Sequence, residues 1–310
     1  MKLLITGCAS RLANASLPVL LNDQRVKNIT GLDVKPSSMS HPRFQFHTAD
    51  VRDNDLAAYF VDTDAVIHLA FIDDNGLLGR QRFDRDYIRS VNVAGTQNVT
   101  RLAAEHKIKT LICVSSAIVY GFSRDNPPFV TEDQPLQSVS NFYYAEDKVA
   151  VEQWLDEFEQ HRPDMRIVRL RPHCILGQHT QPLVTALLKQ PFHLVFKDPQ
   201  PLLQCVSETD VAGALQRALF SDATGAFNLA TDQVASLFLV QQHLHRFSPP
   251  LPYAFARHLH RIAWHYTGRY GDPGWFEGMQ FSLTVANDKA KRELGWFPTL
   301  DLFDCLDATI

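Results

Sequence analysis

Residues 1–13 read MKLLITGCASRLA, an apolar run that ends at a glycine and continues with helical periodicity. Residues 1–6 show no alternation of polar and apolar side chains, which predicts a strand buried on both faces. Gly7 follows where the strand must turn, and the small residues Ser10 and Ala13 come after it at intervals of three. A strand, a glycine turn and a helix in this order predict the first unit of a parallel α/β sheet.

The same alternation continues through the first half of the chain. Apolar runs that end in small or acidic residues are each followed by a stretch with helical periodicity. The predicted strands are residues 1–6, 27–33, 43–47, 65–70, 109–115 and 165–171. The predicted helices are residues 11–22, 53–60, 82–106 and 141–160. This order predicts an α/β fold with a doubly wound parallel sheet, the Rossmann arrangement.

The pattern changes after residue 171, where prolines at positions 172, 182, 191, 199 and 201 interrupt the rhythm. A helix is predicted over 208–220, and a short strand over 225–230 is expected to return to the main sheet. We therefore assign residues 1–177 and about 207–231 to the nucleotide-binding domain. Residues about 178–206 and 232–310 are assigned to a smaller C-terminal lobe for the substrate.

The composition is typical of a soluble globular protein. Of 310 residues, 45% are hydrophobic and 21% are charged, which excludes disordered and low-complexity classes. The formal net charge of -4 gives no net attraction to nucleic acid or to anionic membranes, so neither is predicted as a partner. No run approaches the ~18 apolar residues of a membrane span.

The cysteines and histidines predict neither disulfides nor a metal site. The five cysteines are odd in number and form no CxxC pair, which favours a reducing compartment and a cytoplasmic location. Two His-x-His pairs, at 243/245 and 258/260, lack an acidic partner at ligand spacing. We therefore predict that the protein holds no metal.

The turn after the first strand carries part of a glycine fingerprint for a dinucleotide. In the spacing G-x-x-G-x-x-G, only Gly7 is a glycine, and Ser10 and Ala13 hold the other two places. Ala13 allows close packing of helix on strand, and Ser10 offers a hydroxyl to a phosphate. A pyrophosphate is predicted to lie against Gly7, Ser10, Arg11 and Leu12 at the start of the helix. The alternative is an ordinary turn between strand and helix.

Asp33 closes the second strand, 26 residues after Gly7. A carboxylate there accepts hydrogen bonds from the adenosine ribose and repels a 2′-phosphate, which favours NAD over NADP. The alternative interpretation of Asp33 is a turn residue before Pro36. The other predicted cofactor contacts follow the third and fourth strands: Asp50 and Val51 at the adenine, and Leu69 and Ala70 beside the path of the cofactor.

A serine, a tyrosine and a lysine predict the reaction centre. Ser116 follows the fifth strand, and Tyr144 and Lys148 come later on a predicted helix. Their spacing of four residues puts the phenol and the ammonium on one face of that helix. The positive charge is expected to lower the pKa of Tyr144, so that it serves as a general acid or base. Ser116 would polarise the reacting oxygen during hydride transfer, and Lys148 would bind the nicotinamide ribose.

Three other features are interpreted as structural. His68 is expected to be a hydrogen-bonded histidine of the core. The pair Asp73 and Asp74 is expected to be a solvated part of a loop, although it could contact the substrate. The aromatic stretch 264–276 is assigned to packing of the lobe, rather than to a cover over an apolar substrate or to a membrane surface.

With these residues in place, the chain resembles the extended short-chain dehydrogenases/reductases, in the NAD-dependent epimerase/dehydratase family. Similar motifs extend over nearly the whole sequence: VNVAGT at 91–96, LRP at 170–172, Gly177, TDVA at 209–212 and LGW at 294–296. The resemblance implies that Ser116, Tyr144 and Lys148 are the catalytic triad. It also implies that Asn92 supports the site, that Pro172 lines the nicotinamide, and that the chain forms a homodimer through helices 82–106 and 141–160.

Departures from the family pattern narrow the predicted substrate. Ala117 and Ile118 stand where dehydratases of the family carry Asp and Glu, so dehydration is not expected. Cys174 stands where sugar-nucleotide epimerases carry Asn, and the Arg-Pro form of 171–172 resembles members that act on apolar alcohols and ketones. We therefore predict an NAD-dependent oxidoreductase with a small-molecule substrate. The alternatives are a nucleotide-sugar epimerase and a non-enzymatic dinucleotide-binding regulator.

Overall fold

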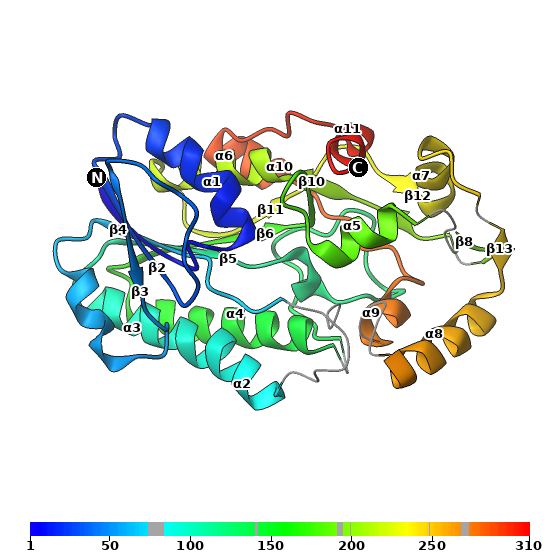
Figure 1. Ribbon diagram of the computed structural model, residues 1–310, viewed down its shortest axis with the longest axis horizontal. Helices are drawn as coiled ribbons and strands as arrows, with labels where there is room; N and C mark the ends of the chain where they lie inside the picture. Colours follow the sequence, from blue (N-terminus) through cyan, green and yellow to red (C-terminus); the bar gives the residue numbers. More distant parts are fainter. Residues whose placement is uncertain (74–83, 140–141, 191–194, 199, 248, 268–272) are drawn as a thin grey trace.

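The computed structural model describes residues 1–73, 84–139, 142–190, 195–198, 200–247, 249–267 and 273–310. A seven-stranded sheet passes through its centre, in the order β11-β6-β5-β4-β1-β2-β3, and all neighbouring strands are parallel (Figure 1). Its strands are β1 (Lys2–Thr6), β2 (Asn28–Asp33), β3 (Phe44–Thr48), β4 (Ala65–His68), β5 (Thr110–Val114), β6 (Arg166–Pro172) and β11 (Gly225–Leu229).

Helices cover both faces of this sheet. One face packs against α1 (Arg11–Asn22) and α6 (Glu208–Leu219), and the other packs against α3 (Thr96–Glu105) and α4 (Tyr143–His161). The chain moves outward from β1 to β3 and then crosses back to β4, so the strand order reverses between β1 and β4. Ligands of such sheets bind in the crevice outside the carboxyl ends of the strands at this reversal. The predicted doubly wound fold is confirmed.

The predicted elements differ from the observed ones mainly in the type of helix. Residues 54–60 form a 3₁₀ helix. The predicted helix 82–106 is divided into α2 (Arg85–Arg89), a π-helical stretch over Ser90–Gly95, and α3. The predicted starts of two helices, at residues 82 and 141, lie outside the described residues. The predicted return strand is confirmed as β11, at the edge of the sheet next to β6.

The rest of the chain builds short elements beside the carboxyl ends of the sheet. Three two-stranded pairs form there, β10-β7, β12-β9 and β13-β8. The elements are β7 (Cys174–Leu176), α5 (Pro182–Leu188), β8 (Val195–Phe196), β9 (Leu202–Leu203), β10 (Cys205–Ser207), β12 (Ala235–Ser236), α7 (Leu237–His243), β13 (Pro250–Leu251), α8 (Tyr253–Thr267), α9 (Pro273–Gly278), α10 (Asp288–Leu294) and α11 (Leu302–Asp307).

The C-terminal residues pack into the core of the sheet. Ala290, Leu294 and Trp296 join the apolar cluster that α1 and α6 form on one face. The indole Nε1 of Trp296 donates to the carbonyl of Asp210 over 2.8 Å. Just before α10, Nδ2 of Asn287 donates to the carbonyl of Ala230 over 2.8 Å. The chain therefore returns to the sheet close to the point where it left after β11.

Candidate active site

The turn after β1 requires a glycine. Gly7 has a φ of 70°, and a Cβ there would lie 2.4 Å from the backbone nitrogen of Ala70 and 2.6 Å from the carbonyl carbon of Leu69. Real Cβ atoms do not approach backbone atoms so closely, and left-handed φ favours glycine. Leu69 and Ala70, predicted beside the cofactor, therefore lie directly against the glycine turn.

Ser10 and Ala13 hold the fingerprint's other two places without strain. Ser10 has a φ of -68°, which suits any residue, and its hydroxyl caps α1 by accepting from the backbone nitrogen of Ala13 at 3.2 Å. Ala13 is completely buried in the core, as close packing of helix on strand requires. In the described part of the chain, the backbone nitrogens of Arg11 and Leu12 donate no hydrogen bond. Those two donors at a helix N-terminus fit a pyrophosphate.

Asp33 lies at the carboxyl end of β2, next to the turn. Its carboxylate accepts from the backbone nitrogen of Ala9 at 2.9 Å and from that of Lys35 at 2.9 Å. The side chain thus tightens the glycine turn and its own loop at the same time. This position, beside the first turn of α1, is compatible with the predicted contact to an adenosine ribose.

Asp50 and Val51 follow β3, with Arg52 next to them. The Asp50 carboxylate accepts from the Arg52 guanidinium at 2.6 Å and 2.9 Å, and this hydrogen-bonded cation lowers the pKa of Asp50. Val51 is buried, and its carbonyl accepts from Asn98 of α3 at 3.0 Å. The predicted adenine contacts therefore lie on a loop that is held against α3.

The structure brings the predicted serine and tyrosine together. Ser116 follows β5, and Tyr144 lies in the first turn of α4. Both side chains line the same cavity, where hydrogen bonding by Ser116 pulls the pKa of Tyr144 downward. The neighbouring Ser115 is buried and donates to Glu152, so Ser116 is the serine that faces the cavity.

Lys148 lies one turn after Tyr144 and is buried. Its ammonium donates to the carbonyl of Val114 over 2.8 Å and lies 3.5 Å from the centre of the Phe71 ring. It lies 5.8 Å from the centre of the Tyr144 ring. Burial lowers the pKa of Lys148 to about 8, against the opposing pull of nearby carboxylates.

The expected low pKa of Tyr144 is wrong for the protein as described. Burial raises the pKa of Tyr144 above its ordinary value, since it penalises the phenolate. The hydrogen bond with Ser116 acts in the opposite direction and is outweighed, while the charge of Asp73 raises the pKa further. Sequence spacing places a cation near the phenol, but it does not reveal how dry the site is.

A cavity of about 270 Å³ opens beside these residues. Its polar lining comes from Arg11, Asp73, Ser116, Tyr144, His173, Cys174, His179, Gln181 and Glu208. Its apolar lining comes from Leu12, Ala117, Ile118, Phe122, Phe142, Ile175, Val184, Trp275 and Leu283. The predicted reaction centre therefore faces a cavity lined by both polar and apolar side chains.

The charged groups that line this cavity are paired. Arg11 donates to both carboxylate oxygens of Asp73 at 2.7 Å, and His179 lies 3.1 Å from Glu208. Asp73, expected to be solvated, is therefore part of the cavity wall, while Asp74 lies outside the described residues. No local pattern predicts this pairing, because Arg11 and Asp73 are 62 residues apart.

Two other predicted residues support the site from behind. Asn92 is completely buried; its side chain holds both backbone polar groups of Ile72 and donates to the Asp147 carboxylate at 3.0 Å. Its amide thus links the loop after β4 to α4, next to Lys148, and does not line the cavity. Pro172 is buried at the end of β6, and its neighbour His173 lines the cavity instead.

His68 is a core histidine, as expected. Thr6 and Thr96 bond its two ring nitrogens at 2.6 Å and 2.9 Å, and burial lowers its pKa to about 3.

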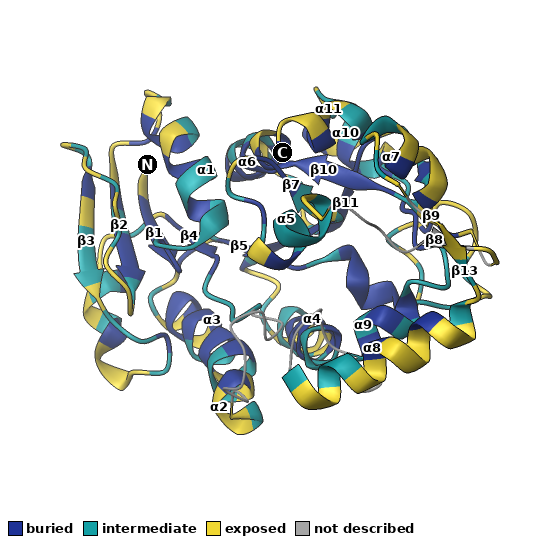
Figure 2. Cartoon of the chain, turned by 45° about the vertical axis from the view of Figure 1, so that its right-hand side comes forward, coloured by how far each residue is buried: buried dark blue, intermediate teal, exposed yellow. Residues whose placement is uncertain are grey.

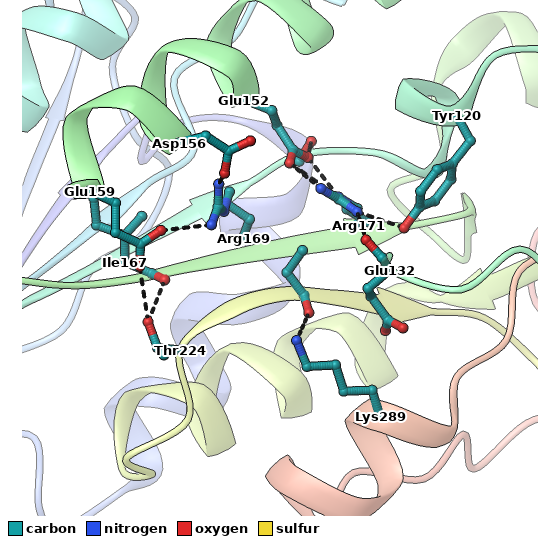
Figure 3. Close-up of polar contacts among 12 residues, drawn as sticks. Tyr120, Glu132, Glu152, Asp156, Glu159, Ile167, Arg169, Arg171, Thr224 and Lys289 are labelled. Carbon is teal, nitrogen blue, oxygen red and sulfur yellow. Dashed lines mark hydrogen bonds and ion pairs between the residues drawn. The ribbon is translucent and has the colours of Figure 1, made fainter. Parts of the chain in front are cut away.

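A buried ion pair that sequence reasoning missed lies behind the reaction centre (Figure 3). The Arg171 guanidinium of β6 donates to both carboxylate oxygens of Glu152 on α4, at 2.9 Å and 2.5 Å for the nearest contacts. Arg171 also donates to the Tyr120 hydroxyl at 2.7 Å. That hydroxyl in turn donates to Oδ1 of Asn228 on β11 at 2.7 Å. The available signal was the spacing of four that continues from Tyr144 and Lys148 to Glu152.

Comparison with known proteins identifies a family. A model described as the NAD dependent epimerase/dehydratase family matches residues 3–219. The chain is 24% identical over 315 residues to an uncharacterised protein of Mycobacterium tuberculosis, covering 97% of this chain and 82% of that one. It is 28% identical over 176 residues to a UDP-glucose 4-epimerase of Dictyostelium discoideum, covering 56% of this chain and 45% of that enzyme.

Solved structures share the fold over the whole chain. MoeE5, solved in complex with UDP-glucuronic acid and NAD, matches with a TM-score of 0.77 at 19% identity, covering 100% of this chain and 97% of MoeE5. A UDP-glucuronic acid 4-epimerase from Bacillus cereus in complex with NAD matches with a TM-score of 0.76 at 20% identity and the same coverage. These likenesses confirm the predicted fold.

Proposed function

This chain belongs to the NAD-dependent epimerase/dehydratase family, which confirms NAD as the predicted cofactor, and from that premise we propose an NAD-dependent oxidoreductase. Its proposed substrate is an uncharged, largely apolar secondary alcohol or the corresponding ketone. The observation that carries the proposal is that Ser116 and Tyr144 line one cavity whose charged groups are already paired.

Each residue of the pair has a distinct role in this proposal. Oxidation of an alcohol removes a hydride from the carbinol carbon and a proton from its oxygen. NAD supplies the hydride acceptor when it is bound. Tyr144 takes this proton in its phenolate form; in the reverse direction, ketone reduction, the neutral phenol that its raised pKa favours gives the proton back to the oxygen. Ser116 donates a hydrogen bond to the carbonyl oxygen in both directions. Lys148, one turn away, holds positive charge behind the phenol.

The lining of the cavity is the reason for an uncharged substrate. A nucleotide diphosphate needs cations to offset its charge, and in the described residues the one arginine of the lining is occupied by Asp73. Trp275, Phe122 and Leu283 line the same cavity and suit an apolar skeleton. Cys174, at the place of the epimerase asparagine, also lines the cavity.

The proposal is tested by hydride transfer with matched variants. Purified protein is incubated with NAD and a panel of apolar secondary alcohols, sterols included, and NADH formation is followed. Tyr144→Phe is expected to reduce turnover at least ~100-fold, the usual contribution of a general acid or base, while NAD affinity stays within about twofold. Tyr143→Phe removes the neighbouring hydroxyl and is expected to keep turnover. Equal turnover in both variants would remove Tyr144 from the mechanism.

A second candidate is a nucleotide-sugar 4-epimerase, favoured by the likeness to UDP-glucose 4-epimerases over 56% of this chain. In that case a hydride would move from a sugar carbon to NAD and return to the same carbon, so that NAD shows no net change. Interconversion of UDP-glucose and UDP-galactose without accumulating NADH would establish this candidate and overturn the oxidoreductase. Tight NAD binding without turnover on either panel would instead favour a regulator.

We also propose that the chain forms a homodimer through α3 and α4. The outer part of α4 carries Trp154 and Phe158, which are partly buried and stack with ring centres 5.0 Å apart. Sedimentation equilibrium is expected to give twice the mass of one chain, and Trp154→Glu is expected to give a single chain. A single-chain mass for the unaltered protein would contradict the proposal.

A further inference from the structure

Helix α8 carries an apolar stripe that faces away from the protein. Its buried residues are Ala256 and His260, which lie against α9, where His260 stacks on Phe276 at 4.3 Å. At 100° per residue, four large side chains fall within about 60° on another side of the helix. They are Phe255, Leu259, Ile262 and Tyr266, with exposed fractions of 53%, 44%, 43% and 73%.

The surroundings of α8 concentrate exposed apolar groups. Fourteen large hydrophobic residues are exposed in the described part of the chain, and seven of them lie between residues 238 and 266. Figure 2 shows α8 along the edge of the molecule, with exposed residues over much of its length. A convex ridge at the edge can be reached along its whole length by a flat surface.

Charge is segregated in the same stretch of sequence. Residues 233–267 contain no Asp and no Glu, but they contain three Arg and five His. This segment contributes +3 to a formal charge of -4, so the other residues together carry -7. His258 and His265 border the apolar stripe, and Arg257 and Arg261 follow on the side opposite it. The expectation of no membrane partner rested on the net charge, which conceals this local excess.

An apolar stripe beside a cationic face is the pattern of a helix that lies in the interface of an anionic bilayer. A second copy of the chain fits the pattern less well. A two-fold dimer places one patch against itself, so Arg257 and the bordering histidines would face their own copies. Residues 233–267 contain no carboxylate, and the Glu277 carboxylate of α9 is already paired with Arg261. Anionic headgroups supply the missing negative charge, and the acyl boundary takes the apolar stripe.

We propose that α8 docks this protein on the surface of anionic phospholipid membranes, with Phe255, Leu259, Ile262 and Tyr266 inserted below the headgroups. The proposal rests on the exposed stripe and on the charge segregation. It does not depend on which reaction the cavity performs. No helix in the described residues is long and apolar enough to cross a membrane, so the predicted attachment is peripheral.

Co-sedimentation with vesicles tests the proposal. The intact protein is mixed with vesicles of phosphatidylglycerol and phosphatidylcholine, or of phosphatidylcholine alone. We expect binding to the anionic vesicles and at least about fivefold weaker binding to the neutral ones. Raising the salt from ~0.1 M to ~1 M shortens the screening length from about 10 Å to about 3 Å and is expected to weaken binding to anionic vesicles.

Matched variants distinguish vesicle binding through the apolar stripe from non-specific adsorption of the protein to vesicles. Ile262→Gln and Leu259→Gln are each expected to weaken vesicle binding about tenfold, since each removes one buried aliphatic side chain. Val61→Gln changes an equally exposed valine outside the lobe and is expected to leave binding unchanged. Arg257→Gln is expected to weaken binding to anionic vesicles about fivefold, and Arg124→Gln is the control for a lost surface charge.

Two results would overturn the proposal. One is equal sedimentation of the intact protein and Ile262→Gln with anionic vesicles. The other is self-association that Ile262→Gln abolishes while vesicles capture no protein, which would make the stripe an interface between two copies. NAD binding by each variant confirms that the variant is folded, so that loss of vesicle binding reports on the surface alone.

Discussion

At the scale of single residues, Gly7 and Gly213 show opposite effects of a missing side chain. A Cβ on Gly7 would lie 2.4 Å from a backbone atom of the loop after β4, in a backbone with a φ of 70°. A Cβ on Gly213, inside α6, would meet no atom within 4 Å. The first glycine is required by the close approach of two loops, and the second only weakens a helix.

We expect Gly7→Ala and Gly213→Ala to change stability in opposite directions. Gly7→Ala should lower the free energy of unfolding by about 3 kcal/mol and abolish NAD binding, because the turn must open. Gly213→Ala should raise it by about 1 kcal/mol, because alanine is the better helix former. Urea denaturation and calorimetric titration with NAD measure both quantities. Equal stabilities for the two variants would contradict the close approach at Gly7.

Lys148 makes the stability depend on pH. Its folded pKa is about 8, against 10.5 in the unfolded chain, so between these values the unfolded state binds the proton and the folded state does not. Stability therefore rises with pH through this window. Relative to Lys148→Met, the unaltered protein should gain about 3 kcal/mol between pH 8 and 10.5, measured by urea denaturation. A difference that stays constant with pH would contradict the burial of the ammonium.

Residue identities could be predicted here, but residue environments could not. The spacing of Tyr144 and Lys148 and the serine after β5 point to the cavity. The direction of the Tyr144 pKa depends on burial by Phe71 and neighbours that come from several parts of the chain. The pairing of Asp73 with Arg11 was missed for the same reason, since Arg11 lies on the other side of the reversal between β1 and β4.

At the scale of elements, one ion pair joins α4 to β6. Both side chains are almost fully buried, at 5% exposure for Arg171 and 0% for Glu152. Figure 3 shows the Arg171 side chain directed at the Glu152 carboxylate. Ser115, which follows β5, donates to the same carboxylate, so three elements meet at Glu152. Ser116 follows directly, and its orientation toward the cavity depends on this anchor.

Removing both partners of this ion pair should lower the free energy of unfolding by less than the two single removals added together. Glu152→Gln leaves the Arg171 guanidinium buried without a counter-charge and is expected to cost about 3 kcal/mol of unfolding free energy. The double variant Glu152→Gln/Arg171→Gln should cost less than the sum of the single variants by at least ~1 kcal/mol. A cycle of urea denaturation experiments measures this coupling. Additive costs would mean that the two side chains act independently.

The strands were predictable because burial on both faces leaves a continuous apolar run. The long helix predicted over 82–106 was not continuous, for a tertiary reason. Asn92 bonds the loop after β4 and Asp147, and the stretch Ser90–Gly95 is π-helical there. A Cβ on Gly95 would lie 2.5 Å from the Val51 side chain. Helical periodicity records the exposed and buried sides of a helix, but not a turn that widens to fit a neighbour.

At the scale of the whole molecule, residues near the C-terminus belong to the same apolar core as the first strand and the first helix. Trp296 is 1% exposed and packs with side chains of β1, α1 and α6. Its neighbour Phe297 is 60% exposed. The sequence contains the LGW motif at 294–296 but does not reveal which core it joins, because packing between distant parts of the chain leaves no local periodicity.

This contact predicts a global effect of a distal substitution. Trp296→Ala should lower the unfolding free energy by about 4 kcal/mol, since it leaves a large cavity in the main core. Phe297→Ala should change it by no more than about 0.5 kcal/mol. Both variants should still unfold in one transition, followed by near-UV and far-UV circular dichroism together. A separate early transition in Trp296→Ala would show that the C-terminal residues form an independent unit.

The hydrogen bond between Asn287 and Ala230 brings together the two ends of a long segment of the chain. The 56 residues between them therefore leave the sheet and return to it at neighbouring points. They include Trp275 and Leu283 of the cavity wall and all of α8. A segment whose two ends are adjacent in the fold can be replaced by another segment without moving the rest of the chain. Replacing this segment would change part of the lining of the cavity and the whole of α8, while Ser116 and Tyr144 lie outside it and would be kept.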